Sequence, residues 1–331
     1  MTDTQPQKNS AQSSHLSATA HPAQSVSTVA PDQVERNARA QRCLPLLAQW
    51  WDANARPFPW RFGRTTPWGV LVSEIMSQQT PMQRVLPYWT AWMRAWPTPE
   101  ALAEATAAEV IAAWGRLGYP RRSLRLRECA QSVCKDWGGE VPHDYDDLLA
   151  LPGVGDYTAS AVMSFAFGER AAVVDTNVRR VLARAVEGRE SLGGAARVSE
   201  RRRIDEYLPA DKQQSVVWNQ SVMELGAVVC TAVQPACDTC PIASECAFLA
   251  AGRPGLGERR TRPRQRFVGT DRQVRGIVLK ALREAGPGAR LDYRQVSALW
   301  TDAVQLDSCL ASLDEDGLIV LGPGKSVSLP V

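Results

Sequence analysis

Four cysteines within seventeen residues constrain this chain more than any other feature of its sequence. Cys230 is followed after six intervening residues by Cys237, after two more by Cys240, and after five more by Cys246. Thiolate sulfur is a soft ligand, so four thiolates can close a tetrahedral zinc site or hold the corners of a [4Fe–4S] cluster. Zinc ribbons usually join two close cysteine pairs across a long loop, whereas only one pair is close here. The spacing therefore favours one compact loop around a [4Fe–4S] cluster, with zinc as the alternative ahead of disulfides.

Length and composition leave room for one large hydrophobic core or two smaller ones. The 331 residues are 44% hydrophobic and 22% charged, with a net charge of +3. A charge this small does not by itself indicate nucleic-acid binding, which depends on clustered positive charge. The sequence contains no apolar segment typical of a signal peptide and no run of 18 apolar residues. We therefore expect no membrane span and a cytoplasmic protein.

The middle of the chain has a helical pattern. From Pro31 to about Pro241, apolar residues recur at spacings of three and four, as in Leu44, Leu47 and Trp51. No convincing alternating run predicts a strand there. We expect an all-α body over residues 32–229 and the cysteine loop at 230–246. The polar residues 1–31 are expected to be a disordered tail, because they offer too little apolar surface to offset the entropy of ordering.

The chain changes character after a basic, proline-containing linker at residues 247–267. Apolar spacings then predict helices over residues 274–282, 293–299 and 306–313, and a hairpin of residues 318–321 and 327–331. This order suggests a winged-helix-like α+β module over residues 268–331. Its third helix carries Asp307, Asp314, Glu315 and Asp316, which phosphates would repel. We therefore favour a docking or packing role for the module over groove reading.

A glycine-containing turn suggests a phosphate-binding site. Leu151-Pro152-Gly153-Val154-Gly155 precedes a helical stretch that begins near Tyr157. Gly153 and Gly155 would let the backbone approach a partner closely, and the helix that follows offers unpaired N–H groups and the positive end of its dipole. A plain helix–helix turn is the alternative for such a pattern taken alone.

Two carboxylates stand in contexts that suit acid–base chemistry. Asp175 follows two valines and precedes a predicted helix, where by default it would be an N-cap. Glu74, on another predicted helix, lies one turn from Val70 and Leu71, so apolar neighbours could raise the pKa of its carboxyl. A carboxyl that keeps its proton near neutral pH is a candidate general acid, although an acidic residue on a helix is more often a solvated surface group.

Together these features resemble the MutY adenine glycosylases of the helix-hairpin-helix superfamily, which also contains endonuclease III. The cysteine spacing is similar to the superfamily's cluster loop, residues 151–155 to its DNA-gripping hairpin, and residues 72–80, VSEIMSQQT, to the MutY signature. The resemblance covers roughly residues 45–250. It implies a two-lobed all-α fold with a [4Fe–4S] loop and a monomeric protein. Its substrate would be double-stranded DNA containing A:8-oxoguanine or A:G mispairs.

The resemblance also implies roles for the two carboxylates. The residue matching Glu74 protonates the adenine, and the residue matching Asp175 stabilises positive charge on the sugar, with Asn177 orienting it. Tyr157 stands where bifunctional relatives carry a lysine that forms a Schiff base and leads to strand cleavage, which tyrosine cannot do. We therefore expect hydrolysis of the N-glycosidic bond to an abasic site, without lyase activity.

Pocket and DNA contacts follow from the same resemblance. The residues expected to line the adenine pocket are Arg56, Trp60, Arg61, Gln220 and Met223. Those expected to meet the DNA around the mispair are Gln78, Gln79, Thr80, Tyr119 and Arg121. Pro120 replaces the aromatic that many members insert into the base stack, so Tyr119 or Gln79 would serve as the wedge. Phosphate contacts are also expected from the arginines of residues 121–127 and 259–266.

Two alternatives stay open on the sequence alone. A non-catalytic iron–sulfur protein that binds DNA or senses redox state would use the same hairpin and cysteines, but it would not need carboxylates at both Glu74 and Asp175. An endonuclease III-type glycosylase of other specificity is the second alternative. Glu74 argues against it, and so does Tyr157 in place of the lysine.

Overall fold

The computed structural model describes residues 31–194, 198–258, 267–286 and 288–331. The body comprises α1 (Pro31–Asn54), α2 (Pro67–Ser77), α3 (Met82–Ala95), α4 (Pro99–Glu104), α5 (Ala107–Trp114), α6 (Arg121–Trp137), α7 (Tyr145–Ala150), α8 (Asp156–Phe165), α9 (Thr176–Ala185), α10 (Val198–Tyr207), α11 (Lys212–Val228), η1 (Cys237–Thr239), η2 (Ala243–Glu245) and α12 (Ala247–Ala250). Across its described residues this body holds no strand, which confirms the predicted all-α class. Residues 1–30 of the expected tail lie outside the described residues. No described helix is long and apolar enough to cross a membrane.

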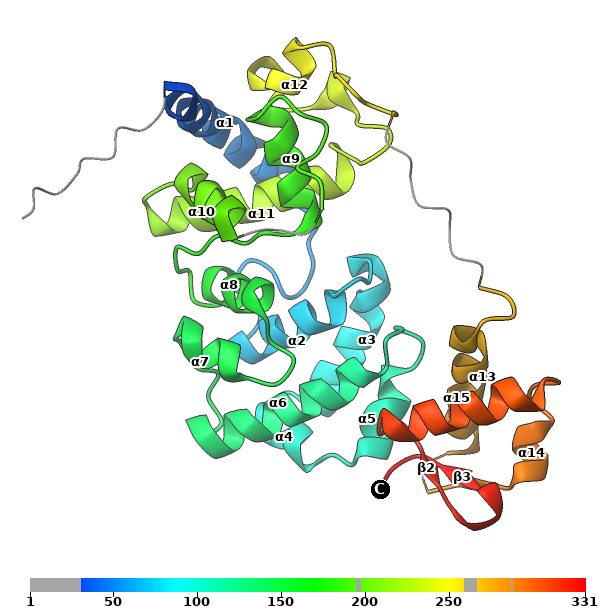
Figure 1. The fold of residues 1–331 in the computed structure, drawn as a ribbon. Helices are drawn as coiled ribbons and strands as arrows, with labels where there is room; N and C mark the ends of the chain where they lie inside the picture. Colours follow the sequence, from blue (N-terminus) through cyan, green and yellow to red (C-terminus); the bar gives the residue numbers. More distant parts are fainter. Residues whose placement is uncertain (1–30, 195–197, 259–266, 287) are drawn as a thin grey trace, which may run out of the picture.

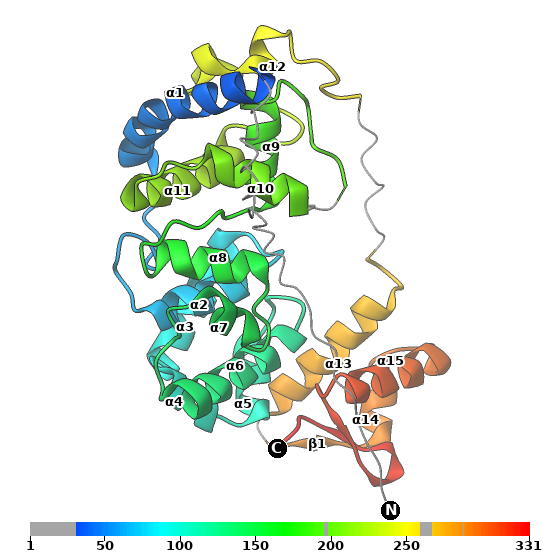
Figure 2. The same ribbon diagram turned by 60° about the vertical axis from the view of Figure 1, so that its left-hand side comes forward.

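Two hydrophobic cores divide the body into two lobes. The first core is built mainly by α2–α8 and contains Trp92, Trp114 and Leu126. The second is built mainly by α1 and α9–α11 and contains Leu47 and Trp218. In Figures 1 and 2, α1 lies beside α9–α12 at one end of the body, and α2–α7 lie at the other. The chain therefore starts in the second lobe, builds the first and returns, so that residues distant in sequence meet between the lobes.

Helix α2 is almost wholly buried, and its start is well defined. Pro67 occupies its first turn, and Thr66 Oγ1 accepts a hydrogen bond from Gly69 N at 3.3 Å. A Cβ at Gly69 would lie 2.1 Å from Thr65 Oγ1, so glycine allows the chain to pass close to its own helix. The buried face continues through Glu74. Because α2 is packed on nearly all sides, Glu74 is held in the interior of the protein.

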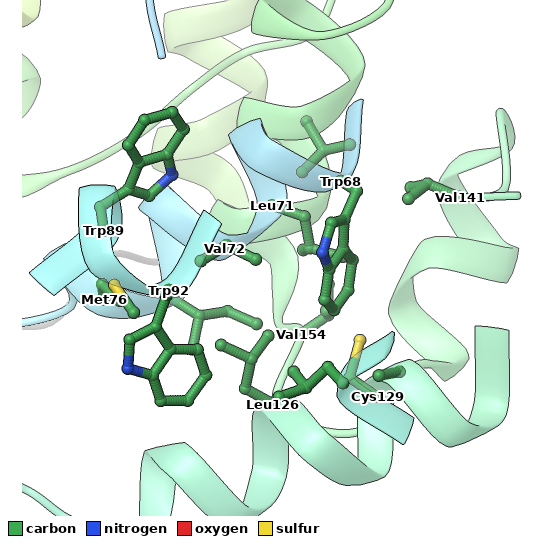
Figure 3. Close-up of a cluster of buried hydrophobic side chains, with 14 of the residues drawn as sticks. Trp68, Leu71, Val72, Met76, Trp89, Trp92, Leu126, Cys129, Val141 and Val154 are labelled. Carbon is green, nitrogen blue, oxygen red and sulfur yellow. The ribbon is translucent and has the colours of Figure 1, made fainter. Parts of the chain in front are cut away.

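Tryptophans supply much of the first core (Figure 3). Trp68 of α2 belongs to the same cluster as Leu126 and Cys129 of α6, and Figure 3 shows its ring directed toward their side of the core. Trp89 of α3 donates from Nε1 to Gly69 O at 2.8 Å, so its polar atom is satisfied inside the core. These contacts fix α2 against α3 and α6 and therefore fix the position of the residues that α2 carries toward the other lobe.

The C-terminal residues form a small α+β module around a third hydrophobic cluster. It contains α13 (Asp271–Ala285), β1 (Arg290–Leu291), α14 (Tyr293–Ser297), α15 (Ala303–Glu315), β2 (Val320–Leu321), η3 (Pro323–Lys325) and β3 (Val327–Ser328). The antiparallel sheet has the order β1-β3-β2, with Val327 opposite Leu291 and Leu321. The three helices and the hairpin agree with the prediction. Strand β1 was not predicted, because two residues are too few to show the alternation of apolar and polar side chains that indicates a strand.

The module packs on the first lobe (Figure 1). Ala108 and Ile111 of α5 belong to the same hydrophobic cluster as Val278 and Leu310 of the module. Removing the module would therefore expose apolar surface on α5. This contact supports the predicted packing role.

Acidic residues of α15 are engaged within the protein. Asp316 pairs with Arg275 and also with Arg121 of α6, at 3.1 Å. Asp307 pairs with Lys325 at 2.7 Å. These pairs offset much of the negative charge that argued against DNA binding, and one of them joins the module to the body.

Candidate active site

Glu74 is buried between the two lobes, with only 5% of its surface exposed. The Tyr157 hydroxyl donates a hydrogen bond to its Oε2 at 3.0 Å. Burial raises the pKa of Glu74 to about 7, although this hydrogen bond and the charge of Arg61 oppose the rise. The nearby negative charge of Asp175 raises the pKa further. The carboxyl can therefore hold a proton near neutral pH, as a general acid must.

A pocket beside Glu74 draws its walls from both lobes. Its lining residues are Trp60, Arg61, Val70, Glu74, Met82, Phe165, Gln220 and Met223. Four of the five residues predicted to line an adenine pocket are among them. Val70, Met82 and Phe165 were not predicted to line the pocket, because an apolar side chain on a helix has the same sequence pattern whether it faces a core or a pocket.

Arg56, the fifth predicted residue, lies behind the wall and does not line the pocket. Its Nη2 donates to Glu224 Oε2 at 2.9 Å, and Arg61 Nη2 donates to the same oxygen at 2.8 Å. Glu224 is 1% exposed, and two guanidinium groups hold its pKa below the usual value despite burial. The buried carboxylate thus orients Arg61 at the pocket. This role of Glu224 was not predicted, because its partner Arg61 lies 163 residues away in the sequence.

Asp175 is both the N-cap of α9 and a neighbour of the pocket acid. Its Oδ1 accepts from Val178 N at 2.7 Å, and its Oδ2 accepts from Asn177 Nδ2 at 2.8 Å. Burial raises the pKa of Asp175, while these hydrogen bonds and the charge of Arg180 act in the opposite direction. The arrangement fits the prediction that Asn177 orients Asp175.

A chain of hydrogen bonds connects Asp175 to the cysteine loop. Arg180 Nη2 donates to Asn177 Oδ1 at 2.7 Å, and Arg180 Nε donates to the carbonyl oxygen of Cys230 at 2.7 Å. Arg180 Nη2 also donates to Gly226 O at 2.6 Å. A side chain at Gly226 would clash with Asn177, whose Cβ lies 2.7 Å from the position of a Cβ at residue 226. The position of Asp175 thus depends on the packing of α9 against α11 and on the start of the loop.

Tyr157 serves as a neutral donor in this site. Burial raises its pKa well above 10, and the neighbouring charges of Glu74 and Asp175 add to the effect. Its hydroxyl also lies 4.0 Å from Met223 Sδ. Tyr157 therefore holds Glu74 in place through a neutral hydroxyl.

The predicted DNA-contacting residues at the end of α2 differ in exposure. Gln79 is exposed, and its backbone lies in the left-handed region with φ +54°. Gln78 Nε2 lies within hydrogen-bond distance of Gly153 O and Thr158 Oγ1, at 3.5 and 3.4 Å. Thr80 is only 8% exposed, and its hydroxyl is bound to backbone carbonyls. The Thr80 side chain therefore anchors the loop from within, and its contact with DNA stays a prediction.

The expected hairpin is present as α7, a five-residue turn and α8. Gly153 has φ +80°, and a Cβ there would lie 3.2 Å from Arg125 Cβ, so the turn needs glycine both for its conformation and for its close approach to α6. Gly155 is the N-cap of α8, and a Cβ there would meet open space. The backbone at this turn is therefore open to a partner, while Asp156 in the first turn of α8 pairs with Arg201 at 2.8 Å.

The four cysteines of the loop line one recess. Cys230, Cys237, Cys240 and Cys246 share it with apolar side chains of both α9 and α12, among them Val181 and Phe248. Arg184, 1% exposed, donates from Nη1 to Thr231 O at 2.7 Å and lies 3.6 Å from Cys230 Sγ. Among the described His, Cys, Asp and Glu side chains, no group of three is spaced for a single metal ion. The donor set and its shared recess fit the predicted cluster.

The arginines of α6, from which phosphate contacts are predicted, differ in their exposure and their partners. Arg127 Nε donates to Ala105 O at 2.5 Å, and Arg122 donates only to groups within the protein. Both guanidinium groups bind backbone carbonyls inside the protein, which argues against phosphate contact by these two side chains. Arg121 stays 57% exposed beside Asp316. The arginines of residues 259–266 lie outside the described residues.

Comparison with known proteins identifies the family. A family model described as HhH-GPD superfamily base excision DNA repair protein matches residues 72–191. The adenine DNA glycosylase of Mycobacterium tuberculosis (strain CDC 1551 / Oshkosh) is 45% identical over 286 residues, which are 86% of this chain and 92% of that protein. The chain belongs to the MutY-type adenine DNA glycosylases. The adenine DNA glycosylase of Mycolicibacterium smegmatis is 46% identical over 275 residues, and that of Homo sapiens 40% over 214 residues, 38% of its own length.

Solved structures agree with the MutY-type assignment at the level of the fold. A thermostable thymine-DNA glycosylase matches with a TM-score of 0.58 and 27% identity, over 65% of this chain and 98% of that chain. A non-covalent endonuclease III–DNA complex matches with a TM-score of 0.56 and 22% identity, over 65% and 97%. Both matches confirm the helix-hairpin-helix glycosylase fold predicted from the sequence.

Proposed function

We propose that this protein removes adenine mispaired with 8-oxoguanine or guanine from double-stranded DNA and leaves an abasic site. The observation that carries the proposal is the buried Glu74 carboxyl, with a pKa of about 7, in the wall of a pocket shared by both lobes. Membership of the adenine DNA glycosylase family supports the choice of base. The base would leave the duplex by flipping, which costs a few kcal/mol and least at a mispair.

Glu74 would act as the general acid. Because its Oε2 accepts the Tyr157 hydrogen bond, the acidic proton is best placed on Oε1. Transfer of this proton to N7 of adenine turns the base into a neutral leaving group, and the C1′–N9 bond then breaks. A pKa near the working pH keeps a large fraction of the carboxyl protonated without making the proton too tightly held to transfer.

Asp175 would stabilise the sugar as positive charge develops on it. Backbone and side-chain donors fix its carboxylate before the reaction, so little reorganisation is needed when the charge appears. Water then adds to C1′ and releases a proton, which balances the one that Glu74 gave to the adenine and leaves the abasic site. The pair of carboxylates, one protonated and one charged, resembles the arrangement used for glycoside hydrolysis.

The same geometry supports a reaction without strand cleavage. A lyase needs an amine that attacks the sugar, and the residues lining the described pocket include Arg61 but no lysine. Tyr157, at the expected lysine position, is engaged with Glu74. An endonuclease III-type lyase would need a lysine in the pocket lining and a lysine in place of Tyr157.

We infer that Cys230, Cys237, Cys240 and Cys246 hold a [4Fe–4S] cluster. The bonds between a bound cluster and the four thiolates would fix the conformation of the loop. Through the Arg180 hydrogen bonds, the fixed loop would in turn stabilise the position of α9 and Asp175. The proposed reaction transfers no electrons, so the role assigned to the cluster is structural. The elements would then divide as expected from the sequence, into a body at 32–229, a cluster loop at 230–246, a basic linker at 247–267 and a module at 268–331, in a monomer.

One assay tests the proposal. The protein is incubated with an A:8-oxoguanine duplex and treated with hot alkali, which cleaves the adenine strand at any abasic site. A cleaved adenine strand that appears only after alkali supports a glycosylase without lyase activity. Binding without adenine release would favour the non-catalytic iron–sulfur protein, and cleavage before alkali would favour a lyase.

A further inference from the structure

Arg122 occupies the contact between the C-terminal end of α2 and the loop that leads into α6. Its Nη1 donates to Ile75 O at 2.9 Å, to Met76 O at 3.1 Å and to Gln78 O at 2.5 Å. The last carbonyls of a helix have no partner within the helix, and a cation is favourable near them. Arg122 therefore caps the helix that carries Glu74.

The other terminal nitrogen of Arg122 reaches a second segment. Nη2 donates to Gly118 O at 3.1 Å and to Thr80 Oγ1 at 3.0 Å. The guanidinium also lies 5.2 Å from the ring centroid of Trp114 and 5.5 Å from that of Tyr119. A planar fork can bind two sites in fixed relative positions, which an ammonium group cannot do.

Two of the carbonyls that Arg122 binds each come directly before a residue with a left-handed backbone. Gln78 O belongs to the peptide that precedes Gln79, and Gly118 O belongs to the peptide that precedes Tyr119. Gln79 has φ +54° and Tyr119 has φ +48°, a region that residues with a Cβ rarely adopt. Both residues are exposed, and both are the candidates for insertion into the base stack. One side chain thus holds the peptide in front of each of them.

We propose that Arg122 is a positioning residue that locks Gln79 and Tyr119 into a single prearranged wedge and ties that wedge to the Glu74 helix. The guanidinium contacts both peptides at once, so its removal loosens the restraint on both left-handed residues, even though Trp114 Nε1 still donates to Gly118 O at 2.9 Å and the Thr80 hydroxyl still donates to Gln78 O at 3.3 Å. Both loops would then relax independently of each other, and base flipping would slow while the acid remained intact. This inference rests on the proposed removal of adenine from a mispair.

Arg122→Met tests the proposal, because methionine keeps much of the apolar stem and removes all the donors. Adenine release from an A:8-oxoguanine duplex is measured under single-turnover conditions, and 2-aminopurine next to the adenine reports unstacking when the protein binds. We expect the rate to fall at least about tenfold and the fluorescence increase to be largely lost. The pH at which the rate is half-maximal should not move, because the surroundings of Glu74 stay the same.

Arg127→Met is the matched control. Arg127 lies on the same helix, is half-buried and also donates to a backbone carbonyl, that of Ala105, but it touches neither loop. We expect its rate and its fluorescence signal to match the wild type. Arg122→Lys keeps the charge but not the fork, and should show the same pattern as Arg122→Met with a smaller loss. The lysine variant carries the test by itself if the methionine variant does not fold.

Three results would overturn the proposal. These are an unchanged rate, a slowed rate with the full fluorescence increase, and a slowed rate with a shifted pH midpoint. The second would place the defect after flipping, and the third would mean that Arg122 acts on the acid itself. Each of them requires an active wild-type protein. A wild type that releases no adenine would refute the proposed function and is thus a separate outcome.

Discussion

Replacing Glu74 by glutamine should abolish adenine release and also make the folded protein more stable above neutral pH. Glutamine keeps the size of the side chain, and its carbonyl oxygen can still accept the hydrogen bond from Tyr157. It has no acidic proton to give. Binding to an A:8-oxoguanine duplex should therefore stay close to that of the wild type while turnover is lost.

The expected gain in stability follows from the pKa of Glu74. Burial raises this pKa from 4.5 to about 7, so the folded state binds the proton more tightly than the unfolded state does. Above pH 7 the carboxyl is ionised in both states, and burying its charge costs the folded state about 3 kcal/mol, at roughly 1.4 kcal/mol per tenfold change in proton affinity. Between pH 7 and pH 4.5 the cost declines as the folded carboxyl takes up its proton, and below pH 4.5 it vanishes.

The measurement compares thermal unfolding of the wild type and Glu74→Gln at pH 5 and at pH 8.5. Glu74→Gln should melt at a higher temperature than the wild type at pH 8.5, and the difference should shrink markedly at pH 5. Glu284→Gln, an exposed site on α13, serves as the control and should show no such pH-dependent gain. A difference that is the same at both pH values would refute the reasoning about Glu74, and so would substantial turnover by the Glu74→Gln variant.

Asp175→Asn should slow adenine release at least about 10²-fold in single-turnover assays, because a preorganised negative charge is lost; a near-normal rate would reduce Asp175 to a helix cap. For protein purified without oxygen, elemental analysis should find about four irons per chain, and the absorption spectrum should show a broad band near the violet edge of the visible. Zinc in a colourless protein would reverse the cluster assignment. Deletion of residues 268–331 should change the ratio of single-turnover rates on A:8-oxoguanine and A:G by less than about tenfold, or roughly 1.4 kcal/mol. A larger change in a truncated protein that keeps its iron would show that the module senses the lesion.

Features that are local in the chain could be predicted from the sequence. The spacing of the four cysteines, the glycines at 153 and 155, and the position of Asp175 at the start of a helix depend on a few neighbouring residues. Helix periodicity extends over one or two turns, so the all-α body and the three helices of the module were also readable. The two-residue strand β1 was not, because its pairing with β3 is a contact across 36 or more residues.

Only the tertiary structure decided which charged and polar side chains were available for function. Arg122 reads as one arginine in a basic run, but it binds carbonyls 44 to 47 residues earlier in the chain, so its guanidinium is directed into the protein. Thr80 and Glu224 are likewise assigned to the interior by partners distant in sequence. The pKa of Glu74 is set by burial between the lobes and by Tyr157, 83 residues away. Residue type determines which proton or charge a side chain can offer, whereas desolvation and partner geometry determine whether it is offered, and both of these depend on how the two lobes come together.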